Sequence, residues 1–186
     1  MSDNRTNRSV YRRGADDGLW FGIYLSVLLL SSFCSLTVAS ALGWLSMIMA
    51  VSVPLMVYFC LKRSYRQDNY RSQFSMLWLH GICIFFFGGL IMALTAYVYM
   101  RFVNPSFYSD VFDMLLKVYE QSGVPADNPN YMMLAKINEA KMFPTAGESA
   151  MELLMSSVFT GSILSMLIAL IVRATSRRTT PPPMQS

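Results

Sequence analysis

Charged residues are scarce in this chain. Only 14% of its 186 residues are Asp, Glu, Lys or Arg, while 54% are hydrophobic. A soluble domain carries about 25% charged residues, and its helices need a polar face toward water. Residues 18–61 contain no Asp, Glu, Lys, Arg or His at all. This deficit excludes a small soluble domain and predicts an integral membrane protein with the length of one domain.

Cysteine and histidine are also scarce. The three cysteines, Cys34, Cys60 and Cys83, each lie in a hydrophobic run. None is spaced from another as in a metal or redox motif, so we interpret them as small buried apolar thiols. The loops contain no cysteine, which argues against a disulfide-exchange enzyme. We therefore predict no metal site and no cofactor.

The hydrophobic runs lack carboxylates, lysine and arginine in their central turns. An ion-coupled transporter or an intramembrane protease needs such groups there, so both classes are disfavoured. We predict that the protein is not an enzyme and that it has no catalytic residues. The basic segment KRSYR lacks a surrounding basic fold, so we expect no nucleic-acid partner.

Four segments are long and apolar enough to cross a membrane. A crossing helix needs about 20 mostly apolar residues. Residues 19–39, 41–61 and 153–172 meet this length, and a fourth span lies within residues 74–103. Pro54 predicts a kink in the second span. Arg12 and Arg13 precede the first run as in a signal peptide, but the run is longer than a signal sequence and another span follows, so we expect it to be retained.

Lysine and arginine are distributed unevenly among the connections. Eleven of the 15 lie in the amino-terminal tail, the loop after the second span and the carboxyl-terminal tail. Four spans place these three segments on one side of the membrane. Positive residues accumulate on the cytoplasmic side, so both termini are predicted to be cytoplasmic. Clustered basic residues also attract anionic lipid, by about 1 kcal/mol each.

The spans and their charges divide the chain into five parts. The expected parts are a basic cytoplasmic tail (1–17), spans one to three with a basic cytoplasmic loop at 62–73 (18–103), a periplasmic helical loop (104–145), span four with a periplasmic start (146–173) and a proline-rich cytoplasmic tail (174–186).

Small residues recur at helical spacing in three of the spans. Such residues let helix backbones approach closely, which favours helix association in lipid. They predict a compact four-helix bundle, although the stripe in span four can face its own bundle or a second subunit. The candidate helix-packing residues are Gly18, Gly22, Ser26, Gly89, Ala93, Ala96, Ser157, Gly161, Ser165 and Ala169.

His80 of the third span and Arg101 at its outer boundary are candidate polar or lipid-headgroup contacts. Counting about 20 residues back from Tyr97 and Tyr99 places the hydrocarbon boundary beside His80. We expect a neutral interfacial imidazole, hydrogen-bonded to water or to a backbone carbonyl. Arg101 follows the span. It can bind a phosphate, extend toward the interface, or pair with an acidic residue of the next loop, Asp110 or Asp113.

The long loop after the third span carries the pattern of two short amphipathic helices. Asn104 before a proline disfavours continuing the third helix. The first loop helix is predicted to be capped by Ser109 and to end at Gly123. Asn128, followed by Pro129 in the first turn, predicts the start of the second.

Thr145 and Glu148 form a T-x-x-E capping box, so the last helix is expected to begin before the membrane does. The predicted fold is therefore all-α: an integral membrane four-helix bundle with a short amphipathic helical hairpin between spans three and four. The hairpin can lie on the outer leaflet, pack over the end of the bundle, or dock a partner.

Three stretches carry a resemblance to a known family. They are GLWFGIYL at the first span, LKRSYR after the second, and FSMLWLHGICIFFFGGLIMALTAYVYMRFVNPSF through the third. Together they resemble the bacterial domain-of-unknown-function family 4199. The resemblance implies a four-span protein of the bacterial inner membrane with an extended loop between spans three and four. It brings no activity and no catalytic residue.

Two functions fit these observations. The first is a non-enzymatic scaffold or accessory subunit in bacterial envelope assembly, which binds a membrane protein or itself through the small-residue stripes and the hairpin. The alternative is a small transporter or lipid-handling protein, for example a homodimer. Its passage would be lined by His80, Arg101 and the serines of the spans.

Overall fold

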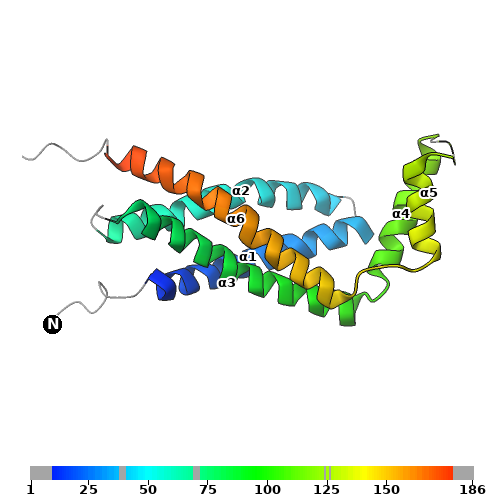
Figure 1. Ribbon diagram of the computed structural model, residues 1–186, viewed down its shortest axis with the longest axis horizontal. Helices are drawn as coiled ribbons and strands as arrows, with labels where there is room; N and C mark the ends of the chain where they lie inside the picture. The colour runs from blue at the N-terminus through cyan, green and yellow to red at the C-terminus, as the bar shows by residue number, and fades with distance from the viewer. Residues whose placement is uncertain (1–9, 38–40, 69–71, 124, 126, 178–186) are drawn as a thin grey trace, which may run out of the picture.

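The computed structural model describes residues 10–37, 41–68, 72–123, 125 and 127–177 (Figure 1). Residues 1–9 of the expected amino-terminal tail and residues 178–186 of the expected proline-rich tail lie outside the described residues. The regular elements of the described part are all helical. They are α1 (Val10–Thr37), α2 (Ala41–Gln67), α3 (Phe74–Val98), the π-helical turn η1 (Tyr99–Val103), α4 (Phe107–Gln121), α5 (Pro129–Glu139) and α6 (Ala146–Arg177).

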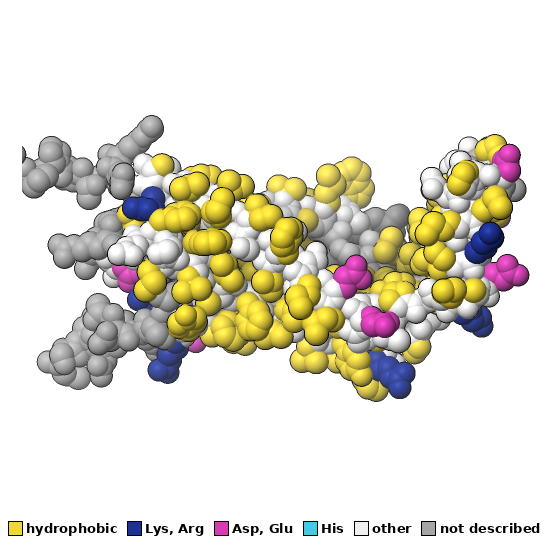
Figure 2. Space-filling view, in the orientation of Figure 1, with side chains coloured by type: hydrophobic (Ala, Val, Ile, Leu, Met, Phe, Trp, Pro, Cys, Tyr) yellow, Lys and Arg dark blue, Asp and Glu magenta, His cyan; other side chains and the backbone are white. Residues whose placement is uncertain are grey.

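Four of these helices are long and apolar enough to cross a membrane. They pack side by side, and the α4–α5 hairpin stands across one end of the bundle (Figure 1). Hydrophobic side chains cover the visible flank of the bundle, whereas most charged ones lie toward its two ends (Figure 2). The predicted all-α fold, with four candidate spans and a hairpin, is confirmed. The candidate spans are Tyr11–Leu36, Gly43–Gln67, Phe74–Val103 and Ala146–Thr175.

The helices extend beyond the apolar runs that predict them. Residues 10–17 are helical rather than a separate tail, and α2 continues to Gln67 through half of the expected 62–73 loop. The apolar run marks where a helix enters hydrocarbon, but backbone hydrogen bonding continues into the polar interface, where charged side chains are tolerated. This difference matters because residues 13 and 17 thereby join α1.

Helix α3 lies at the centre of the bundle. It packs most extensively against α1 and α6, while α2 is more peripheral. Phe21 of α1 meets Phe85 of α3 edge to face, with ring centroids 5.0 Å apart, an arrangement that aromatic pairs favour. Only the second half of α2 enters the core. The main cluster is Phe21, Leu25, Val57, Leu61, Tyr65, Leu77, Ile84, Phe85, Ile168, Ala169 and Val172.

The small-residue stripes face the interior of this bundle. A Cβ atom added at Gly22 would lie 2.8 Å from Cβ of Ile91, and one at Gly161 would lie 2.1 Å from Cγ of Phe85. The backbones of α1 and α6 thus approach α3 more closely than a larger side chain permits. The stripe of α6, which the sequence left unassigned, therefore packs within its own bundle.

The remaining candidate packing residues lie in the same contacts. A Cβ atom at Gly18 would meet Phe87, and one at Gly89 would meet Ser157. Thr95 of α3 donates a hydrogen bond to Ser26 of α1 at 3.0 Å between the two hydroxyl oxygens. Ala93, Ala96, Ser165 and Ala169 are buried.

A second core cluster attaches the hairpin to the bundle. Phe107, the first residue of α4, is buried against Phe33 of α1, with ring centroids 4.5 Å apart. The hydroxyl oxygens of Tyr108 and Ser149 lie 2.6 Å apart and join α4 to α6. The predicted cap at Ser109 is wrong, because α4 begins two residues earlier, where this aromatic packing holds the chain.

The other predicted loop signals are confirmed. Gly123 has a φ of +69° just after α4, as expected of a glycine that ends a helix. Asn128 caps α5 by accepting a hydrogen bond from the backbone N–H of Asn130 at 2.9 Å. The backbone N–H of Thr145 donates to Glu148, whose own N–H donates to the Thr145 hydroxyl, which completes the capping box.

Two glycines of α6 provide a matched test of the close packing. We expect Gly161→Ala to lower the unfolding free energy of the detergent-solubilised protein by about 1–3 kcal/mol, because the added methyl group displaces the buried Phe85 ring. Gly147→Ala should cause no loss, since nothing lies within 4 Å of a Cβ atom there. Equal thermal unfolding temperatures for the two variants would contradict this packing.

Candidate functional site: a polar cluster at one end of the bundle

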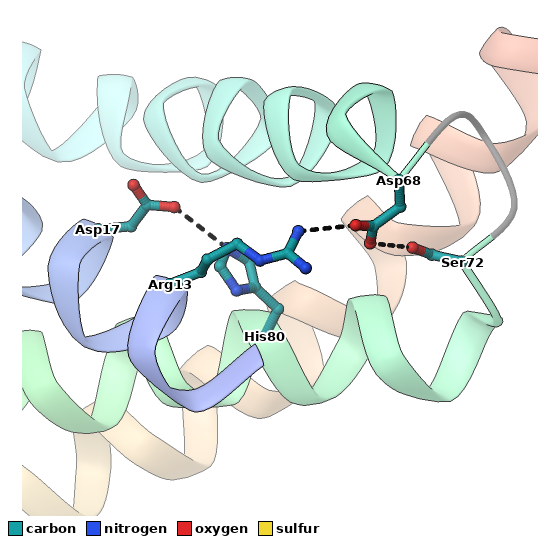
Figure 3. Close-up of polar contacts among 5 residues, drawn as sticks. All are labelled: Arg13, Asp17, Asp68, Ser72 and His80. Atoms are coloured by element: carbon teal, nitrogen blue, oxygen red, sulfur yellow. Dashed lines mark hydrogen bonds and ion pairs between the residues drawn. The ribbon is translucent and has the colours of Figure 1, made fainter. Parts of the chain in front are cut away.

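Five polar side chains gather where α2 ends and α3 begins (Figure 3). Arg13 and Asp17 come from α1, one helical turn apart. Asp68 directly follows α2, Ser72 precedes α3, and His80 lies two turns into α3. The cluster therefore joins the start of α1 to residues 68–80, which are distant from it in sequence.

The outer part of the cluster centres on the Asp68 carboxylate. Arg13 donates a hydrogen bond from Nη1 to Asp68 Oδ1 at 2.7 Å, and the Ser72 hydroxyl donates to the other carboxylate oxygen. Burial alone raises the pKa of Asp68. The hydrogen bonds from Ser72 and Arg13, together with the Arg13 charge, outweigh it and lower the pKa below its usual 3.8. Asp68 is therefore an ionised carboxylate that ties α1 to the α2–α3 connection.

The inner part of the cluster is a pair between His80 and Asp17. Nε2 of His80 lies 3.1 Å from Oδ2 of Asp17, and the imidazole is only 2% exposed. An ionised carboxylate only accepts hydrogen bonds, so Nε2 is the donor. The prediction that His80 forms its hydrogen bond with water or a backbone carbonyl is therefore wrong. The early start of α1 makes Asp17 part of that helix, where α1 packs on α3, instead of leaving it in a tail.

The other imidazole nitrogen of His80 has a different environment. Nδ1 is buried and has no hydrogen-bond partner in the described part of the chain. Among the described residues, the pair therefore rests on the contact between Nε2 of His80 and Asp17 alone. Its direct effect is to hold α1 against α3.

The cluster has limited chemical capacity. The Ser72 hydroxyl donates to Asp68, so it is not aligned on His80 as an activated nucleophile. Within the described residues, no group of three His, Cys, Asp or Glu side chains is arranged to hold a metal ion. What the geometry supports is a polar clamp between helices at the end of the bundle.

Arg101, the other candidate contact, lies at the opposite end of α3. It is in η1 and exposed, so the structure does not bring it together with His80. Pairing with Asp110 or Asp113 is not found among the described residues. Asp110 accepts instead from Ser106 and Asn104, and Asp113 accepts from Asn138. The headgroup contact of Arg101 stays a prediction.

Four members of the cluster, all except His80, were not predicted as site residues from the sequence. Arg13 and Asp17 occupy one helix face at i, i+4 spacing, whereas Asp68 and Ser72 lie outside the helices, between α2 and α3. The available signal was the position of Asp17 directly before the charge-free stretch at residue 18. A carboxylate at the edge of such a stretch remains in reach of the first turns of neighbouring spans.

The His80–Asp17 pair is testable by a double-mutant cycle. Asp17→Ala leaves both imidazole nitrogens without a partner, so we expect it to destabilise the protein by about 1–3 kcal/mol. In a His80→Leu background the same change should cost much less, since no buried donor remains. Unfolding in detergent micelles measures both. A cost of Asp17→Ala that is equal in the two backgrounds would refute the coupling.

The lowered pKa of Asp68 sets a pH dependence. Because its folded-state pKa lies below the unfolded value, the stabilisation is fully present above about pH 4 and is lost as the pH falls through the lowered pKa. We expect the stability difference between the native protein and Asp68→Asn to shrink on acidification. Unfolding measured between about pH 6 and pH 2 tests this, and a difference that grows toward low pH contradicts it.

The family described as "Protein of unknown function (DUF4199)" matches residues 17–174. The match includes Asp17, Asp68, Ser72 and His80 as well as the hairpin, while Arg13 precedes it. No curated protein and no solved structure matches the chain.

Proposed function

Because this chain belongs to the DUF4199 family and has four candidate membrane-spanning helices, we propose that it is a non-enzymatic scaffold or accessory subunit. Its place would be bacterial envelope assembly. The proposal assigns the bundle to anchoring and the α4–α5 hairpin to contact with another protein.

The observation that carries this proposal is that few side chains of the hairpin are buried against the bundle. Phe107 is the only buried residue of α4, and α5 has none. The two helices hold each other, through Asn138 donating to Asp113 at 2.7 Å and the Tyr131 hydroxyl donating to Glu120 at 3.1 Å. A hairpin that is ordered by its own contacts and contributes little to the core is available for recognition.

The small-residue stripes have a different part in this proposal from the one first expected. They pack α1 and α6 against α3, so they are not surfaces for a partner. The contact with another protein is assigned to the polar side of the hairpin, where charged side chains such as Lys117 and Glu139 are exposed.

The proposed location is the inner membrane, with both termini in the cytoplasm and the hairpin in the periplasm. Its support is the charge distribution. The start of α1, the end of α2 and the end of α6 carry seven of the eleven Lys and Arg residues in the described part of the chain, and they lie at the end opposite the hairpin (Figures 1 and 2). This matches the positive-inside pattern of multi-pass proteins.

The orientation is testable with single cysteines in a variant whose own three cysteines are replaced by alanine. We expect Ser122→Cys, just after α4, to react with a membrane-impermeant maleimide in intact cells whose outer membrane has been permeabilised. Gln67→Cys, at the opposite end, should react only after lysis, because the inner membrane shields it. The reverse pattern would invert the proposed topology.

The scaffold role is testable by site-specific photo-crosslinking in living cells. A photoreactive amino acid at position 117 or 139 should give a discrete protein adduct, because both side chains are exposed on the polar side of the hairpin. The control position is Leu94, which is 64% exposed on a candidate span and should contact lipid. Adducts identified by mass spectrometry decide the matter: no protein adduct from either hairpin position would count against a scaffold.

A further inference from the structure

The hairpin carries an apolar face that the bundle leaves uncovered. Met114, Leu115 and Val118 of α4 are 43%, 39% and 46% exposed, and Met133 of α5 is 64% exposed. At 100° per residue, the three α4 positions occupy one arc beside the face that packs on α5. The charged residues of α4 lie outside this arc; they are Asp110, Asp113, Lys117 and Glu120.

The space-filling view shows on which side of the hairpin its hydrophobic side chains gather. Hydrophobic side chains of the hairpin gather mainly on the side nearest the four spans, while its Lys, Asp and Glu side chains lie along the far edge (Figure 2). The hairpin helices run across the long axis of the bundle (Figure 1). If the spans cross a bilayer, these helices lie in the plane of its surface with the apolar side inward.

The apolar face continues the surface by which the spans meet lipid. Phe102 and Val103, at the end of the third candidate span, are 71% and 67% exposed directly before the hairpin. Arg101 is exposed at the same level, where an arginine reaches lipid phosphates. Only the three residues 104–106 separate these exposed side chains from the start of α4.

These observations match the physics of interfacial helices. Such a helix lies at the level of the headgroups, with apolar side chains in the acyl boundary and charged ones in water. We propose that the α4–α5 hairpin is a membrane-surface element whose apolar face, including Val118 and Met133, inserts into the lipid leaflet at that end of the bundle.

This inference is independent of the scaffold role. Lipid would cover the inner face of the hairpin and hold the charged face outward, whether or not a protein binds there. It also accounts for the methionines, since flexible thioether side chains adapt to disordered acyl chains.

The test is electron paramagnetic resonance of the full chain in liposomes of phosphatidylcholine and phosphatidylglycerol. Single nitroxide labels are placed at residues 118 and 133, with residues 117 and 139 as controls on the polar side. All four positions are partly or fully exposed, so labelling should leave the fold intact, which the thermal unfolding temperature verifies.

The expected result is a several-fold higher ratio of oxygen to nickel-chelate collisions at residues 118 and 133 than at residues 117 and 139. Oxygen partitions into acyl chains and the chelate stays in water. Equal ratios at all four positions would mean that the hairpin projects into water, and would overturn the inference. Protection of residues 118 and 133 from both reagents would overturn it as well, because protein would then cover the face. Neither outcome bears on the crosslinking test of the scaffold role.

Discussion

Close approach of α1 and α6 to the central α3 is the constraint on which the rest of the structure depends. Helices in lipid gain little from hiding apolar surface, so they associate through van der Waals contact and hydrogen bonds. Gly22 and Gly161 remove the side chains that would hold the backbones apart, and the Phe85 ring fills the space beside Gly161. Helix α2 contributes fewer such contacts and leaves large apolar side chains exposed on the surface of the bundle, among them Trp44, Ile48 and Val51.

Both ends of the bundle follow from this packing. At one end, α1 and α3 are close enough for Asp17 to accept a hydrogen bond from the buried His80, and Arg13 of α1 reaches Asp68, directly after α2. At the other end, the adjacent ends of α1 and α3 hold Phe107 in an aromatic cluster. The polar contacts at the first end hold the spans together. The aromatic cluster at the other end fixes only the start of α4 and leaves the rest of the hairpin outside the core.

Much of the architecture could be read from local pattern, because the bilayer imposes a length on every crossing helix. The spans, the Gly123 stop, the Asn128 cap and the Thr145–Glu148 box depend on residues close in sequence, and each is present in the structure. The start of α4 could not be read this way. Ser109 is a good local cap, but burial of Phe107 against Phe33 holds the helix start two residues earlier.

The sequence by itself determined that the chain is an all-α protein with four candidate spans and a helical hairpin, since hydropathy, charge and capping are local properties. Only the tertiary structure decided that the α6 stripe faces its own bundle and that Asp17 partners His80. Both depend on which helices pack together and in what register. A stripe of small residues permits close contact with any helix, and only three-dimensional packing chooses the neighbour.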